Sequence, residues 1–301
     1  MSYKYTFTVF TPTYNRGENL RDIYDDLKLQ SYKDFEWLIV DDGSSDNTEN
    51  IVQDFIEENQ ININYIKKNN GGKHTAINVG VKNAKGKLFF LADSDDRIVH
   101  DGLLIMYSTW CNIKNKNNIC GIAGLFSYND GKIVGTKFSE ECNEIPFTHV
   151  YKKYGVIGDK TVVFVTDIMK EFPFPEREGI RFIMEAVVWD EMSKKYNVKC
   201  INEVIQIKEY LEDGLTKSSY TSRLLDGIAY SNLLLINQNT YPINEYRRDR
   251  IWNYINLCSN SLLMKRNYFS EINRLSDKLL YLLFFPRGLI SYLRMKKYVE
   301  K

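Results

Sequence analysis

Residues 87–96 have the sequence Lys87-Leu-Phe-Phe-Leu-Ala-Asp-Ser-Asp-Asp96, in which an apolar run leads directly into three carboxylates. The apolar run predicts a buried strand. Carboxylates this close repel one another, so at the end of a buried strand they favour a bound cation. Mg2+ and Mn2+ prefer oxygen ligands and often share them with a phosphate. The stretch therefore indicates a metal–diphosphate site, and the alternative is a polar turn that caps a helix starting near Asp101.

Three more strands are predicted ahead of this one, at residues 5–11, 35–40 and 61–66. Each is followed by polar, turn-forming residues and then by apolar residues at helical spacing. Strands that alternate with helices in this way predict a parallel sheet with right-handed crossovers. The four polar strand ends should then meet at one edge of the sheet, where open α/β sheets bind their ligands.

Four motifs occupy these strand ends, in the order Thr11-Pro-Thr-Tyr-Asn-Arg16, Val40-Asp-Asp-Gly-Ser-Ser-Asp-Asn-Thr48, Gly71-Gly-Lys-His-Thr-Ala-Ile-Asn78 and Asp93-Ser-Asp-Asp96. Together they resemble the ordered motifs of family 2 glycosyltransferases with the GT-A fold. The resemblance is close over residues 4–110 and looser to residue 215. It implies an α/β fold of the GT-A type, in which a Rossmann-like, mostly parallel sheet is flanked by helices.

The resemblance assigns nucleotide-binding positions, which are Pro12, Thr13, Tyr14, Arg16, Asp42, Lys73, Asp93 and Ser94. Tyr14 would offer its ring to the base, and Asp42 would accept a hydrogen bond from a uracil imide. Lys73, ahead of a predicted helix, would neutralise the diphosphate; the alternative is an ordinary surface lysine. Asp41, Asp46 and Asn78 are expected to stabilise turns and helix packing.

The same resemblance implies Mn2+ or Mg2+ as the cofactor. Asp95 would hold the ion, with Asp93 and Asp96 as further candidate ligands. Some relatives add a histidine near the segment Tyr210-Leu-Glu-Asp-Gly-Leu-Thr216, but the three histidines of this chain lie elsewhere. Asp213 or a water molecule would have to take that place.

The catalytic base is expected farther along the chain, because inverting transfer needs a carboxylate that takes the proton of the acceptor hydroxyl. The family usually supplies it from a Glu-Asp pair at the start of a helix. Here Glu185 matches the first position, whereas Ala186 departs at the second. Glu185 is therefore the predicted base. Asp190, about one and a half helical turns farther on, is the alternative, and a surface glutamate without a catalytic role is the third reading.

Composition indicates a cytosolic enzyme. The net charge of +1 gives no general attraction to nucleic acid. The five cysteines form no close pairs that would indicate disulfides or zinc. The start of the sequence lacks the features of a signal peptide, and no stretch reaches the ~18 apolar residues of a membrane span.

The sequence changes character near residue 218, where helical spacing replaces strand patterns. The expected domains are therefore residues 1–217, catalytic, and residues 218–301, a C-terminal helical extension. Within the first, residues 1–115 would bind the nucleotide and residues 116–217 the acceptor. Residues 278–301 are apolar and aromatic and carry six cations against one anion. This segment, broken at Pro286, is expected at the anionic inner membrane leaflet. The alternative is packing on the catalytic domain or on a second copy.

The sequence thus predicts a metal-dependent, inverting hexosyltransferase that uses a nucleotide-sugar, with a UDP-sugar favoured. Its acceptor would be a hydroxyl of a glycan or lipid-linked oligosaccharide in capsule or other surface polysaccharide synthesis. A non-catalytic nucleotide-sugar-binding scaffold is the first alternative, since Ala186 departs from the family pattern. A sugar nucleotidyltransferase is the second, although residues 12–17 lack the Gly-rich loop such enzymes carry.

Overall fold

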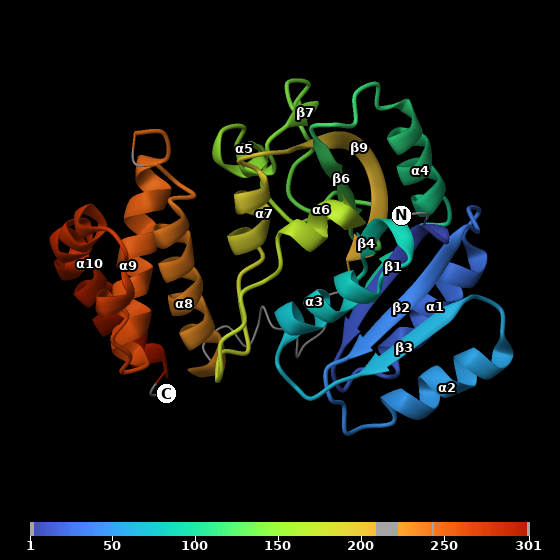
Figure 1. The fold of residues 1–301 in the computed structure, drawn as a ribbon, viewed down its shortest axis with the longest axis horizontal. Helices are drawn as coiled ribbons and strands as arrows, with labels where there is room; N and C mark the ends of the chain where they lie inside the picture. Colours follow the sequence, from blue (N-terminus) through green and yellow to red (C-terminus); the bar gives the residue numbers. More distant parts are fainter. Residues whose placement is uncertain (1–2, 209–221, 243, 300–301) are drawn as a thin grey trace. The chain divides into compact units, whose positions relative to one another are not determined.

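A computed structural model describes residues 3–208, 222–242 and 244–299. The chain divides into two compact units (Figure 1). The first comprises Met1–Pro173 and Lys195–Leu211, and the second Phe174–Lys194 and Glu212–Lys301. The segment Phe174–Lys194 therefore groups with the C-terminal helices rather than with the sheet. The division into nucleotide, acceptor and helical domains remains a prediction about function.

The first half of unit one is the predicted parallel sheet. Its strands lie in the order β3-β2-β1-β4, and every neighbouring pair is parallel. The strands are β1 (Tyr5–Thr13), β2 (Phe35–Asp41), β3 (Ile63–Lys67) and β4 (Gly86–Leu91), joined by α1 (Asn19–Leu29), α2 (Thr48–Glu58) and α3 (Lys73–Asn83). The predicted alternation of strands and helices is confirmed.

Beyond β4 the sheet is mixed. The order continues as β4-β8-β6-β9-β5, with β7 paired to β9, and β8 runs antiparallel to both β4 and β6. The strands are β5 (Asp96–Ile98), β6 (Ile119–Ser127), β7 (Glu144–Ile145), β8 (Lys160–Val165) and β9 (Asn197–Lys208). The helices of this half are α4 (Gly102–Asn112), α5 (Phe147–Lys152) and α6 (Thr166–Glu171). Within the described residues, one sheet thus spans the whole unit.

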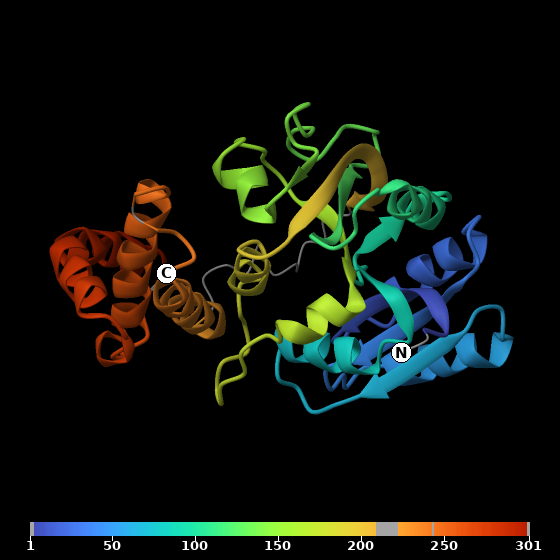
Figure 2. The same ribbon diagram turned by 45° about the horizontal axis from the view of Figure 1, so that its top comes forward.

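Helices cover both faces of the parallel half. On one face, Tyr24 of α1 and Phe55 of α2 stack near Trp37 of β2, whose indole N–H donates to Thr11 Oγ1 at 2.9 Å. Phe10 points to the other face, where its ring lies against Gly80 of α3. Alternate residues of a strand point to opposite faces, so β1 is buried on both sides. Figure 2 shows α3 and α6 side by side on the second face.

Unit two is helical. Its elements are α7 (Ala186–Met192), α8 (Ser222–Gln238), α9 (Arg247–Leu263), the 3-10 helix η1 (Phe269–Glu271) and α10 (Leu275–Val299). Arg250 of α9 is fully buried, and its Nη2 donates to Asp277 Oδ1 of α10 at 2.7 Å. The predicted C-terminal helical extension is confirmed.

The predicted break at Pro286 is wrong, because α10 continues through it. Packing on α9 holds the helix on both sides of the proline. Phe284 stacks on Tyr254, and Gly288 lies against Cys258. In the part of the chain that the structure describes, no helix combines the length and hydropathy needed to cross a membrane.

Candidate active site

The loops after β1 and β2 are fastened to each other. Asn15 has the left-handed φ of 52° that asparagine tolerates better than most residues. Its backbone N–H donates to Ser44 Oγ, and its side-chain oxygen accepts from the Ser45 N–H, both at 2.8 Å. Pro12 and Thr13 are buried at the end of β1, whereas the Tyr14 side chain is 48% exposed. The two loops therefore form one rigid rim that presents an aromatic ring.

Asp42, just past β2, organises the loop that leads into α3. Its Oδ1 accepts from the Gly71 N–H at 2.9 Å and from Lys68 Nζ at 2.7 Å, and its Oδ2 accepts from the Gly72 N–H at 2.7 Å. The residue is only 4% exposed. The predicted nucleoside-binding carboxylate is thus fixed by the glycine loop, and Lys73 follows as the first residue of α3.

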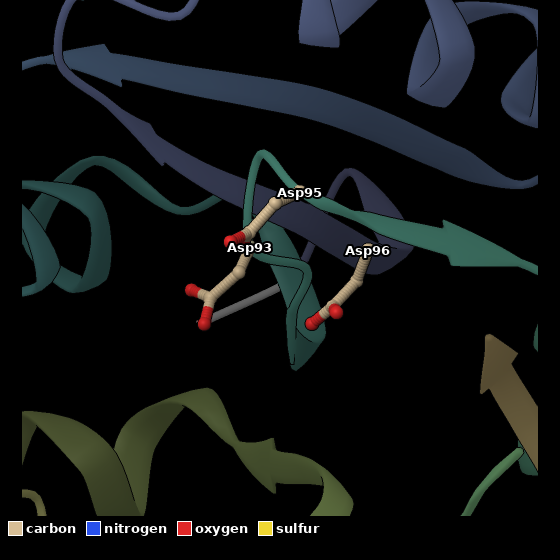
Figure 3. A group of neighbouring side chains, drawn as sticks. All are labelled: Asp93, Asp95 and Asp96. Atoms are coloured by element: carbon tan, nitrogen blue, oxygen red, sulfur yellow. The ribbon is translucent and has the colours of Figure 1, made fainter. Parts of the chain in front are cut away.

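The three carboxylates of the starting motif converge as predicted. Figure 3 shows Asp93 and Asp95 in the loop after β4 and Asp96 at the start of β5. One oxygen from each lies within 4.8 Å of the others. Ser94, which lies between Asp93 and Asp95 in the sequence, is also buried. Three oxygen ligands of one charge sign at this spacing could hold a single hard cation.

Each carboxylate also has a cationic neighbour. Lys73 Nζ lies 2.8 Å from Asp93 Oδ2, and Arg16 Nη1 lies 2.9 Å from Asp95 Oδ2. Lys208, the last residue of β9, lies 3.8 Å from Asp96 Oδ1 and 3.0 Å from Asp159 Oδ2. The fold therefore brings Arg16 and Lys73 to the Asp cluster, although the sequence places the three at separate strand ends.

The pKa values of Asp93 and Asp96 are shifted in opposite directions. Burial raises the pKa of Asp93, but Lys73, together with Lys208 and Arg16, outweighs burial and holds that pKa below its usual range. Burial and the nearby charge of Asp93 raise the pKa of Asp96 to about 8. Lys208 opposes this rise without cancelling it. A bound cation beside Asp96 would favour its ionised form.

The residues present fit a divalent metal ion. Within the described ranges, the buried Asp96 Oδ1 has no hydrogen-bond partner. A buried carboxylate oxygen without a donor is costly, and a metal bond would satisfy it. The donor set is all oxygen, which suits Mg2+ or Mn2+ rather than a softer ion. Asp213, the substitute ligand suggested by the sequence, lies outside the described residues.

Glu185 and Asp190, the two predicted bases, belong to unit two. Glu185 is partly buried at the residue before α7, and its Oε2 accepts from the Trp189 indole N–H at 3.3 Å. Asp190 is buried, and its Oδ2 accepts a hydrogen bond from the Tyr241 hydroxyl. Burial and the Asp190 carboxylate both raise the pKa of Tyr241. Asp190 thus fastens α7 to the segment after α8.

Two lysines of the site were missed by sequence reasoning. Lys68 bridges Asp42 and Thr75, with its Nζ 2.7 Å from each acceptor, and Lys208 faces Asp96. Asp41 has the turn role expected of it, because it accepts from the Ser44 N–H at 2.7 Å and from the Tyr65 hydroxyl at 2.6 Å. Asp46 likewise accepts from the Thr48 N–H at 3.1 Å.

The carboxylate trio, the Arg16 and Lys73 side chains and the exposed Tyr14 ring lie at strand ends of an α/β sheet, the place where such sheets bind ligands. The family model "Glycosyl transferase family 2" matches residues 8–166, which is more than half of the 301 residues. The chain belongs to glycosyltransferase family 2, as its motifs predicted.

Curated relatives agree with this assignment. An uncharacterized glycosyltransferase of Rickettsia felis is 28% identical over 239 residues, which cover 79% of this chain and 37% of the relative. Glycosyltransferase GlyA of Streptococcus pneumoniae is 28% identical over 223 residues, 73% of this chain and 31% of the relative. The chain therefore spans about a third of the length of the curated relatives it matches.

Solved structures share the fold. S. aureus TarS in complex with UDP-GlcNAc matches with a TM-score of 0.60 and 18% identity, covering 93% of this chain and 79% of that one. The mannosyltransferase PcManGT from Pyrobaculum calidifontis, in complex with GDP-Man and Mn2+, matches with a TM-score of 0.56 and 15% identity, covering 99% and 84%. The predicted GT-A fold is confirmed.

Proposed function

We propose that this chain is a metal-dependent glycosyltransferase that moves a sugar from a nucleotide-sugar to a hydroxyl of a glycan, with inversion at the anomeric carbon. The observation that carries the proposal is the Asp93, Asp95 and Asp96 trio, met by Arg16 and Lys73, at the end of β4 in a family 2 chain. Such a group of ligands and counter-ions suits a nucleoside diphosphate bound through a metal.

The rim formed by the loops after β1 and β2 would bind the donor. Tyr14 would stack on the base, and Asp42 would accept from the base edge. Asp42 is already held by Gly71 and Gly72, so it would meet the base without further ordering. The similar TarS structure contains UDP-GlcNAc, which supports a UDP-sugar, whereas PcManGT contains GDP-Man and keeps a GDP-sugar as the alternative.

Asp95, with Asp93 and Asp96, would hold Mn2+ or Mg2+, which when bound would stabilise the charge of the departing diphosphate. Lys73 and Arg16 already contact these carboxylates, so they concentrate positive charge at the same place. Lys73 stands as the first residue of α3, where backbone N–H groups add to this field. These fixed charges favour the state in which the diphosphate leaves.

Glu185 would act as the base. It would take the proton of the acceptor hydroxyl while that oxygen bonds to the anomeric carbon and the carbon–diphosphate bond breaks. One displacement of this kind inverts the configuration. Asp190 is the weaker candidate, because Tyr241 occupies its carboxylate in a buried contact. The acceptor we propose is a growing glycan or lipid-linked oligosaccharide of a capsule or another surface polysaccharide.

Nucleotide release from UDP-, GDP- and dTDP-sugars tests this function. We expect wild type to release one nucleotide with Mn2+ and Glu185→Gln to lose ~10²–10⁴-fold in kcat while keeping its nucleotide affinity. Glu191→Gln, within the helix that follows Glu185 but paired with Lys194, is the matched control and should retain activity. A wild type that binds UDP with metal but never turns over any donor would favour the scaffold alternative, for which Ala186 is the motif departure.

A further inference from the structure

The last helix exposes a long apolar face. Seven large side chains of α10 have exposed fractions between 38% and 73%, and they are Leu275, Leu279, Leu282, Leu283, Leu289, Ile290 and Leu293. Their spacing places all seven on one side of a helix, which we call the α10 stripe. From Leu275 to Leu293 the stripe is about 27 Å long.

The opposite side of α10 is already used. Tyr281 is buried in the core of unit two, and Phe284 and Gly288 contact α9. In both views α10 lies on the side of α9 away from α8 (Figures 1 and 2). The stripe is therefore a second apolar face on a helix whose first face is packed. Apolar faces of this length that are exposed to water usually mark a contact site.

Cations border the stripe along its length. Arg287 and Arg294 are seven residues apart and lie along one edge, and Lys278 and Lys296 are eighteen residues apart and lie along the other. Lys297 adds a fifth positive charge near the end of the helix. The sole carboxylate within the α10 sequence is Asp277, which is buried against Arg250. The outward side of the helix is thus apolar in the middle and positive at both edges.

We propose that the α10 stripe docks on an anionic phospholipid bilayer, with the helix lying in the plane of the interface. Leucine and isoleucine side chains would enter the acyl boundary, and the flanking arginines and lysines would extend to the phosphates. The charge pattern favours a bilayer over a second copy of the chain as the partner of the stripe. If the stripe paired with itself in a symmetric dimer, the cationic edges of one copy would face those of the other and repel.

Vesicle co-sedimentation of the whole chain tests the proposal. We expect binding to vesicles of phosphatidylglycerol and phosphatidylcholine, and at least tenfold weaker binding to phosphatidylcholine alone. The double variant Leu283→Asp/Ile290→Asp should lose binding. Arg287→Gln/Arg294→Gln should weaken it by ~5-fold for each charge removed and should flatten its salt dependence.

Leu29→Asp is the matched control, because Leu29 is an equally exposed leucine of α1 in the other unit. It should bind vesicles as wild type does, and circular dichroism should show that all variants are folded. Equal sedimentation of wild type and Leu283→Asp/Ile290→Asp would overturn the proposal. So would a wild type that ignores vesicles and forms a dimer in solution which the same double variant abolishes, because a second copy would then cover the stripe.

Discussion

At the scale of single residues, Asp96 bears the highest electrostatic cost in the candidate site. Its side chain is buried, Asp93 stands beside it, and one of its oxygens has no hydrogen-bond partner among the residues that the structure describes. Natural proteins retain such unfavourable groups where a ligand compensates them. Lys208 lies 3.8 Å from Asp96 Oδ1 and 3.0 Å from Asp159 Oδ2. It therefore offsets the electrostatic cost of Asp96 only in part.

Asp96→Asn should make the metal-free protein more stable and the metal-bound protein less so. Burial and Asp93 raise the pKa of Asp96 to about 8, so at pH 7 this carboxyl must take up a proton on folding, whereas an amide need not; we expect a gain of ~1–2 kcal/mol in the free energy of unfolding in EDTA. The stabilisation produced by Mn2+ should shrink or vanish in the variant. Urea unfolding with EDTA and with Mn2+ measures both. A variant that is less stable in EDTA yet responds fully to Mn2+ would show that Asp96 is a structural residue.

Asp42→Asn should loosen the loop before α3. The carboxylate accepts from two backbone N–H groups and from Lys68, and an amide offers only one acceptor atom in place of two. We expect a loss of about 2 kcal/mol in the free energy of unfolding together with weaker nucleotide binding. Urea unfolding and isothermal titration calorimetry measure the two effects. Asp54→Asn, on an exposed face of α2, should change neither.

The positions of Asp42 and Asp95 were predictable from sequence, because each carboxylate follows an apolar strand; their roles in binding stay predictions. The positions of Lys68 and Lys208 were not predictable, because a lysine at a strand end has the same local pattern whether it faces solvent or a buried aspartate. Their roles follow from which strands are neighbours, and β5, which begins at Asp96, pairs with β9, which ends at Lys208.

At the scale of elements, the turn into α3 depends on Gly72. Its φ of 97° is a conformation that side chains with a Cβ rarely adopt. Gly72→Ala should cost ~1–3 kcal/mol of stability and should displace Lys73 from Asp93, so nucleotide affinity should fall as well. Denaturation and nucleotide titration measure the two effects.

Gly131→Ala is the control for that prediction. Gly131 has a similar φ of 80° in a loop with no heavy atom near its Cβ position. It should lose stability and keep its nucleotide affinity. If both variants bound nucleotide equally well, the Gly72 turn would have no part in the site.

The parallel half of the sheet was predictable because each apolar strand is followed by a helix of regular spacing, as in β1 and α1. The second half was not. β8 pairs with β4 across more than seventy residues of chain, and β9 pairs with β6 along most of its length and with β7 and β5 near its two ends. Nothing in the local pattern of Lys160–Val165 distinguishes a parallel from an antiparallel strand, so the mixed order depends on tertiary packing.

At the scale of the whole molecule, we expect the two units to contribute separately to turnover and to nucleotide binding. Asp277 accepts from Arg250 and from the Tyr254 hydroxyl, both at 2.7 Å, in the core of unit two. Asp277→Asn leaves Arg250 buried without its counter-ion and should cost about 3–5 kcal/mol. Turnover, for which we propose Glu185 of unit two as the base, should fall, while the proposed metal-dependent nucleotide binding by unit one should persist. A variant that lost nucleotide binding at a temperature where unit one remains folded would contradict this separation.

The central claim is that the carboxylate trio holds a metal that binds a nucleotide diphosphate. The most direct test is a thermal-shift titration of UDP, GDP and dTDP, with and without Mn2+, on wild type and Asp95→Ala. We predict that one nucleotide raises the Tm of wild type by about 5 °C or more at saturation, only with Mn2+, and that Asp95→Ala shows no such shift. No shift with any nucleotide, or an equal shift in Asp95→Ala, would contradict the claim and leave the trio as a polar turn.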